Sequence, residues 1–287
     1  SGLTSVSLSS CTSLTSIGEQ AFYGCKGLTS VDLSGCTSLT SIGESAFSVC
    51  SSLTSVDLSG CTSLTLIGEQ AFYGCKGLTS VDLSSCTSLT SIGKRAFYEC
   101  TGLTSVSLSS CTSLTSIGKD AFYNCSGLTS VSLSSCTSLT SIGSEAFYNC
   151  SGLTSVSFPA SLTSIGEKAF IGCSGLTSVT VDNGNSTYKA VDNVVYTKDR
   201  TTLVFAAGGL TSVTIPSTVT SIGNFAFSGC SGLTSVNFPA SLISIGRYAF
   251  SGCSGLTSVT VDNGNSKYKS VDNVVYTKDG TTLVFAA

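Results

Sequence analysis

Cysteine is the residue type with the strongest chemical potential in this chain of 287 residues, which contains 15 cysteines and no histidine. The cysteines fall into two series, one following the phrase A-F-x-x-C and the other the phrase L-S-x-C. Because no C-x-x-C pair occurs and histidine is missing, no metal site is expected. Each series recurs at an inward position of a repeated phrase. We therefore expect buried thiols that act as small apolar groups, with disulfides between adjacent repeats as the alternative.

Aspartate recurs at one place of the repeated phrase L-T-S-V-D-L-S, in three consecutive copies. This candidate acidic ladder consists of Asp32, Asp57 and Asp82. Like charges stacked at strand spacing repel each other, and a bound cation would relieve that repulsion. The alternative is a solvated face on which hydroxyls and water satisfy the carboxylates. Other repeats carry serine at this place, so any cation site is local.

Tyrosine follows the Ala-Phe pair in five repeats. These residues are Tyr23, Tyr73, Tyr98, Tyr123 and Tyr148. Because the phenylalanine is expected to point into the core, the neighbouring tyrosine should point outward or sideways. A column of exposed tyrosines is a candidate interaction stripe, and the alternative is that each ring covers the adjacent turn.

Asn124, Asn149 and Asn185 each begin an N-x-S/T sequon, a candidate N-glycosylation site in a glycosylating host. Asn185 lies in an expected loop, so we expect it to be the most accessible of the three. The sequence contains only weak indications of other modifications or of catalysis. The many serines have no histidine to act as a base, and neither a G-x-S-x-G phrase nor a phosphate-binding loop occurs. The sequence therefore predicts no enzyme activity, no catalytic site and no cofactor.

A phrase of 25 residues that repeats along the chain determines the elements that position these side chains. It reads LTSVDLSGCTSLTSIGESAFSVCSS over residues 28–52. Self-similarity at a period of about 20–50 residues is typical of a solenoid, in which each repeat is one coil. The L-x-x-V-x-L spacing predicts a strand with alternating inward and outward side chains, and a second short extended piece ends at glycine. The segment E-S-A-F-S-V-C predicts one or two helical turns.

The whole chain, 1–287, is expected to form one β-rich solenoid of parallel strands with short helical turns. Six long repeats occupy 1–152, and shorter repeats occupy 153–181 and 210–261. Residues 182–209 and 262–287 depart from the repeat and predict two inserted β-hairpins, because two β-rich runs flank a short polar turn in each. We expect these hairpins beside the solenoid. The phenylalanines of A-F-x-x-C should form one continuous buried column: Phe22, Phe47, Phe72, Phe97, Phe122, Phe147, Phe170, Phe227 and Phe250.

The charge pattern argues against nucleic acid and membrane partners. The formal net charge is −3, only 10% of residues are charged, and the lysines and arginines are scattered. A protein that binds nucleic acid or an anionic membrane usually concentrates positive charge on one face. No apolar run approaches the roughly 20 residues that a membrane-spanning helix needs. We therefore expect no direct membrane insertion.

The phrase LTSVxFPASLxSIGxxAFxxC at 153–173 and 233–253, with VDNVVYTKDGTTLVF at 271–285, closely resembles the BspA-like leucine-rich repeats of bacterial and some protist surface proteins. The resemblance covers nearly the whole chain. It implies an extracellular or cell-surface structural or binding module that acts in adhesion or protein-protein interaction through the solenoid surface. The implied partner is a protein or glycan ligand. No binding residue carries over, because the shared motif consists of core positions.

The sequences at the two ends of the chain support an alternative function. LVFAA at 203–207 is followed by GGLTSV, whereas LVFAA also ends the chain and SGLTSV begins it. If the end of one molecule were joined to the beginning of another, the repeat pattern would continue in register. This predicts a homopolymer by head-to-tail stacking, a self-assembling fibre subunit that glycosylation could decorate. A fragment cut between repeats would have the same end sequences.

Overall fold

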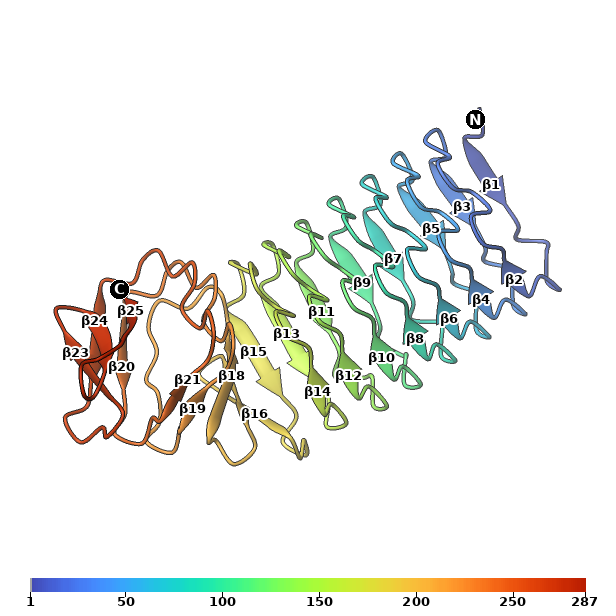
Figure 1. The fold of residues 1–287 in the computed structure, drawn as a ribbon. Helices are drawn as coiled ribbons and strands as arrows, with labels where there is room; N and C mark the ends of the chain where they lie inside the picture. The colour runs from blue at the N-terminus through green and yellow to red at the C-terminus, as the bar shows by residue number, and fades with distance from the viewer. Residues whose placement is uncertain (1) are drawn as a thin grey trace.

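The computed structural model describes residues 2–287, which form an elongated stack of coils with strands on two sides (Figure 1). Each coil contributes a strand to a first row and a shorter strand to a second row. The first row comprises β1 (Ser5–Ser7), β3 (Ser30–Asp32), β5 (Ser55–Asp57), β7 (Ser80–Asp82), β9 (Ser105–Ser107), β11 (Ser130–Ser132), β13 (Ser155–Phe158) and β15 (Ser178–Val181). The second row comprises β2 (Ser16–Ile17), β4 (Ser41–Ile42), β6 (Leu66–Ile67), β8 (Ser91–Ile92), β10 (Ser116–Ile117), β12 (Ser141–Ile142) and β14 (Ser164–Ile165).

Strands of neighbouring coils pair in parallel, one repeat apart, except that the first row is divided into two sheets between β5 and β7. Val6 pairs with Val31 in the first row, and Ile17 pairs with Ile42 in the second. The alternation within each strand follows the expected pattern, since Val31 is buried while Asp32 is partly exposed. The parallel-strand solenoid predicted from the repeat is therefore confirmed.

The predicted helical turns are wrong, because residues 44–50 and their equivalents form a chain of tight turns. Ser45 and Val49 have φ values of 53° and 61°, in the left-handed region that a right-handed helix does not contain. The Ser45 N–H donates to Glu69 O at 2.9 Å, and the Phe47 N–H donates to Ala71 O at 2.8 Å. Since these donors bind the next coil, they are not available for bonds within a helix.

The phenylalanine column is present, but it is completed by a residue from outside the A-F-x-x-C series. Ring centroids of neighbouring coils are 5.2 Å apart, for example between Phe72 and Phe97. At the end of the long block, Phe205 of the first insertion stacks on Phe170 at 5.0 Å. A second run starts at Phe227, which stacks on Phe250 at 4.9 Å. The expectation of one column built from the repeats alone is therefore wrong in this respect.

The insertions are three-stranded antiparallel meanders. The first contains β16 (Tyr188–Val191), β17 (Val194–Thr197) and β18 (Thr202–Ala206). The second contains β23 (Tyr268–Val271), β24 (Val274–Thr277) and β25 (Leu283–Ala286). Between them lie β19 (Ser221–Ile222), β20 (Ser235–Phe238), β21 (Ser244–Ile245) and β22 (Ser258–Val261).

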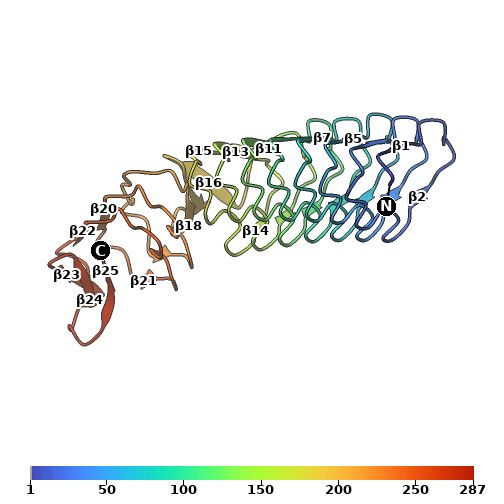
Figure 2. The same ribbon diagram turned by 90° about the horizontal axis from the view of Figure 1, so that it is seen from above.

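The first meander lies within the stack rather than beside it, contrary to the sequence-based expectation. Its last strand, β18, pairs in parallel with β19 of the following coil, with Leu203 opposite Ile222. Val195 is buried in the core of the long block, whereas Val194 is buried in the core of the following block. The meander thus forms a wall shared by two cores. The stack changes direction at this wall (Figure 2).

Candidate functional site: a tyrosine ladder and a gap in the stack

Four consecutive coils place their tyrosines in a stacked ladder along one side of the long block. The ring centroids are 5.0 Å apart between Tyr73 and Tyr98, 4.7 Å between Tyr98 and Tyr123, and 4.8 Å between Tyr123 and Tyr148. Adjacent ring planes differ by 4–6°. All four side chains are partly exposed. The ladder therefore has stacked ring faces inside it and ring edges at its surface.

Tyr23, the fifth tyrosine of the predicted stripe, lies apart from this ladder. The coil that follows it carries Ser48 at the tyrosine place, and Ser48 is buried. Tyr23 consequently has no stacked neighbour among residues 2–287, and its side chain is 57% exposed. The structure therefore brings together four of the five predicted residues.

Charged side chains lie at the edge of the tyrosine ladder. The Arg95 guanidinium lies 5.6 Å from the Tyr98 ring centroid, and its Nε donates to Asp120 Oδ2 at 3.2 Å. Desolvation raises the pKa of Tyr98 and of Tyr123, so both phenols are neutral at physiological pH. The ladder thus offers hydroxyl groups, aromatic edges and one neighbouring cation to a partner.

The three aspartates of the predicted acidic ladder stabilise turns. The Oδ1 atoms of Asp32, Asp57 and Asp82 each accept the backbone N–H of the serine two residues later, at 3.0, 2.9 and 2.9 Å. Hydrogen bonds from Ser34 lower the pKa of Asp32 in this way. Within residues 2–287, no group of three histidine, cysteine or acidic side chains has the arrangement to hold a metal ion.

Asn185, predicted to be the most accessible sequon, is fully buried. Its side-chain Nδ2 donates to Pro159 O and to Leu162 O, each at 2.9 Å. Asn265 makes the same two contacts in the second meander, although it begins no sequon. The repeated asparagine therefore anchors a loop to the preceding coil, and the expectation of accessibility is wrong. Asn149 is exposed and Asn124 is partly exposed.

The cysteines are free thiols, and all except Cys11, Cys25 and Cys253 are buried. The Sγ atoms donate to main-chain carbonyls of the preceding coil, as Cys50 does to Phe22 O and Cys100 to Phe72 O, both at 3.1 Å. Every thiol from Cys36 onward therefore packs in the coil and donates to a carbonyl, whereas Cys11 and Cys25 make no such bond within residues 2–287. Desolvation raises the pKa of Cys100 to about 12.

These thiols predict a loss of stability at alkaline pH. Unfolded thiols ionise near their ordinary pKa of 9.0, whereas the buried Cys61, Cys86 and Cys100 ionise at about 12. Between these values the folded state binds more protons, so the free energy of unfolding falls as the pH rises. The urea midpoint measured in reductant should be lower at about pH 11 than at about pH 8. The urea midpoint of the Cys100→Ala variant should fall less between these two pH values. Equal midpoints of the original protein at both pH values would contradict the raised pKa values of the buried thiols.

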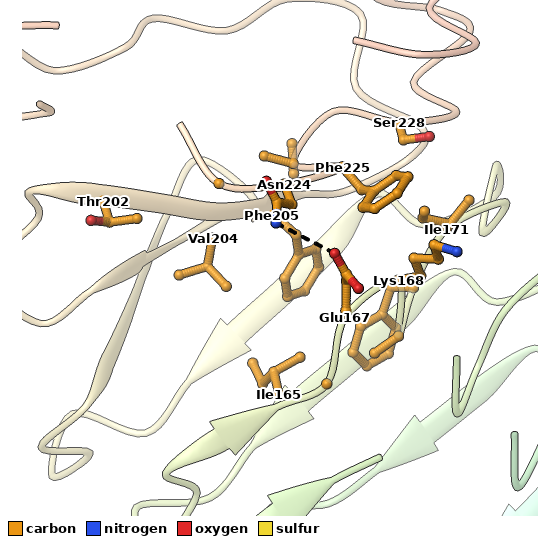
Figure 3. A pocket seen from close by; sticks show the side chains of 16 residues that line it. Ile165, Glu167, Lys168, Ile171, Thr202, Val204, Phe205, Asn224, Phe225 and Ser228 are labelled. Atoms are coloured by element: carbon orange, nitrogen blue, oxygen red, sulfur yellow. Dashed lines mark hydrogen bonds between the residues drawn. The ribbon is translucent and has the colours of Figure 1, made fainter. Parts of the chain in front are cut away.

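A hollow opens where the first meander interrupts the stack. Its volume is about 330 Å³, and it lies between the turns at 166–172 and the turns at 223–229 (Figure 3). Phe205 and Val204 of β18 line it from the meander. Asn224 Nδ2 donates to Glu167 Oε1 across it at 3.4 Å. Sequence reasoning missed this site, and the only available signal was the interruption of the repeat at 182–209.

The sequence profile described as BspA type leucine rich repeat region matches the chain in six copies over residues 1–110, 65–191 and 201–278. The chain belongs to this BspA-type family. No curated protein matches the chain. Among residues 2–287 of this BspA-type protein, no helix is both long and apolar enough to cross a membrane.

Solved structures support the same fold. A leucine-rich cell surface protein from Faecalibacterium prausnitzii is 29% identical, with a TM-score of 0.57, and the match covers 86% of this chain and 64% of that one. The pneumococcal vaccine antigen PcpA is 20% identical, with a TM-score of 0.62, and the match covers 91% of this chain and 61% of that one. The BspA-type chain thus spans less than two thirds of the length of either protein.

Proposed function

We propose that this chain is a protein-binding module of adhesion type, carried on a cell-surface or extracellular protein. The family and the similarity to a leucine-rich cell surface protein support this proposal. Leucine-rich repeat scaffolds are typically non-enzymatic, and their regular surfaces serve as binding faces. The binding face proposed here is the tyrosine ladder, Tyr73 to Tyr148.

The stacking geometry of the ladder is the observation that carries this proposal. Each ring is fixed by its neighbours at 4.7–5.0 Å, so little side-chain entropy remains to be lost on binding. Tyrosine and arginine are enriched at the centres of protein interfaces, where ring and hydroxyl contact the partner together. Arg95 beside Tyr98 completes such a set.

A protein partner fits this surface better than a glycan partner. Sugar rings pack on the exposed faces of aromatic rings. In the ladder, neighbouring tyrosines cover each other's faces, since the ring planes are nearly parallel. Edges and hydroxyl groups remain at the surface, and these match the mixed polar and apolar groups of a protein surface.

The test compares two variants in an adhesion assay. Beads coated with the Tyr98→Ser/Tyr123→Ser protein should bind immobilised extracellular-matrix proteins or cultured epithelial cells at least about 10-fold more weakly than beads coated with the original protein. The Tyr23→Ser protein is the matched control, because Tyr23 lies outside the ladder, and its binding should be unchanged. Thermal unfolding checks that both variants fold. Equal binding by the double variant would remove the ladder from the proposed function.

Head-to-tail assembly remains a second prediction. The second meander has the same strand register as the first, with Val275 opposite Phe285 as Val195 is opposite Phe205. β18 pairs with β19 of a following coil, so β25 has the shape to pair with a coil of another molecule. Molar mass by light scattering over a concentration series tests this, and a constant monomer mass would contradict it.

A further inference from the structure

Chains of hydrogen-bonded peptide units run through the turns of the long block, from coil to coil. One chain passes from Phe97 N–H to Ala121 O at 2.7 Å, from Phe122 N–H to Ala146 O at 2.7 Å, and from Phe147 N–H to Ala169 O at 2.8 Å. Two further rows of hydrogen-bonded peptide units, one on each side of this row, have the same direction from coil to coil. In every coil, the N–H groups of these units point to the following coil and the carbonyl groups to the preceding one. Each coil therefore supplies the acceptors that its predecessor needs.

These chains stop at the hollow. The N–H groups of Lys168, Phe170 and Gly172 occupy the donor positions of the last coil before it, and within residues 2–287 they have no hydrogen-bond partner. The next turns, at 223–229, begin the pattern again, because the Phe225 N–H donates to Arg247 O at 3.0 Å. The meander supplies strand β18 at this level of the stack, but no turns of this kind.

The opposite wall of the hollow carries the complementary acceptors. By the same rule, the carbonyl groups of Asn224, Ala226 and Ser228 point back toward the gap. Ala206 N–H donates to Ala226 O at 2.8 Å, and the carbonyls of Asn224 and Ser228 have no partner in the described part of the chain. One wall thus presents free donors and the other free acceptors, and the two walls meet at Gly172 and Gly229, where a Cβ atom at Gly229 would lie 3.4 Å from Gly172 N.

The hollow also has an apolar floor and a weak polar crossing at its mouth. Phe205 stacks on Phe170 at 5.0 Å, and Val204 lies beside it on β18. The Lys168 ammonium lies 5.0 Å from the Phe225 ring centroid, on the opposite wall. The crossing from Asn224 to Glu167, at 3.4 Å, is long and exposed (Figure 3). A ligand that reaches the apolar floor therefore has to break only a weak hydrogen bond at the mouth of the hollow.

We propose that this hollow binds an extended main-chain segment of a partner protein, which takes the place of the missing turns. A peptide main chain carries carbonyl groups for the Lys168 and Phe170 donors and an N–H group for the Asn224 acceptor. An anion would satisfy only the first wall, and a cation only the second. Donors at the end of a hydrogen-bonded chain are polarised by the bonds behind them, which strengthens their contact with a carbonyl. This mode adds a segment to an open row of main-chain groups.

The segment needs small or aliphatic side chains where it faces the floor. The volume of about 330 Å³ is at the lower end of ligand sites, enough for a few residues of extended chain. None of the four ladder tyrosines lines this site, although Ile171 in its wall holds the tyrosine place of the coil after Tyr148.

Nuclear magnetic resonance of the ¹⁵N-labelled full chain tests the proposal with a defined probe, the capped peptide Ac-Gly-Val-Ser-Val-Gly-NH₂. The amide protons of Lys168 and Phe170 should shift downfield and saturate, with a Kd of about 1 mM or tighter. The Val204→Trp variant fills the hollow, and its affinity should fall at least about 10-fold. Val284→Trp is the matched control, because Val284 holds the equivalent place in the second meander. Its affinity should be unchanged.

Two further arms use the original protein and need no variant to fold. The same peptide with N-methyl groups on its three central residues should lose the saturable shift, because it cannot donate to Asn224 O. Sodium acetate alone should not reproduce the peptide's effect. A missing peptide shift, equal binding of the methylated peptide, or an equal response to acetate would each overturn the proposal. The Tyr98→Ser/Tyr123→Ser protein should bind the peptide normally, which separates this result from that for the ladder.

Discussion

Replacing Phe97 with alanine should lower the free energy of unfolding by about 3–5 kcal/mol. The Phe97 ring is fully buried, and its centroid lies 5.2 Å from the rings of both Phe72 and Phe122. Removing it leaves a cavity between two coils that hold each other in place through this column. Because the backbone of each coil is bonded to both neighbours, the cavity cannot close. The shift in the urea midpoint at constant m-value measures the loss.

Phe22→Ala is the control for this substitution. The Phe22 side chain is only partly buried, and its one stacked neighbour within residues 2–287 is Phe47, at 5.1 Å. The loss should therefore be clearly smaller than that of Phe97→Ala. Equal losses would mean that the stacked column contributes nothing beyond burial of one ring.

The second large effect is expected for Gly118→Ala. A Cβ atom at Gly118 would lie 2.6 Å from Lys94 N and 2.7 Å from Gly93 C. Both contacts are with backbone of the preceding coil, which its own hydrogen bonds hold in place. The coils would have to separate locally, at a cost of about 3 kcal/mol or more. Urea unfolding followed by circular dichroism measures this loss.

Gly18→Ala is the matched control, because Gly18 holds the same place in the first coil. A Cβ atom there has no heavy atom within 4 Å. The free energy of unfolding should change by less than about 1 kcal/mol. A severe loss at Gly18, or a harmless substitution at Gly118, would show that close approach of the coils is not the reason for glycine at this place.

The architecture of the coils could be predicted because the residues that determine it lie close together in the sequence and recur in each repeat. The spacing of Leu28, Val31 and Leu33 marks one strand with its inward face, and the period of the phrase sets which strands pair. The register of Val31 with Val56 follows directly from that period. The burial of Phe47 and Cys50 could be predicted because apolar residues recur at these two places of the repeat, although the helical turns expected to position them do not form.

The turns could not be predicted in the same way. Left-handed φ values at Ser45 and Val49 contradict the intrinsic preference of both residue types. Hydrogen bonds to the next coil impose this conformation, and a single repeat does not contain that information. Tertiary bonding therefore decides against the helix that the local sequence favours.

The candidate sites were partly predictable. The tyrosine ladder follows from the repeat, and only Ser48 in one coil interrupts it. The burial of Asn185 depends on two carbonyls of a coil that lies more than 20 residues earlier in the chain. The hollow beside Phe205 results from a segment that the meander lacks. A repeat pattern shows which side chains and main-chain groups recur. It does not show which of them lack a partner in the neighbouring coil.

The uniform orientation of peptide units in the turns has an electrical consequence. Each unit has a dipole of about 3.5 D, and alignment of such units gives an α-helix its macrodipole. In the long block, the units follow one direction from the first turns to those at 166–172. Paired strands contribute little to such a sum. The row of turns should therefore carry a negative end at its first coil and a positive end at Lys168 and Phe170, and the units that donate to the preceding coil, as Thr40 does to Thr15 O at 2.8 Å, oppose this dipole elsewhere in each coil.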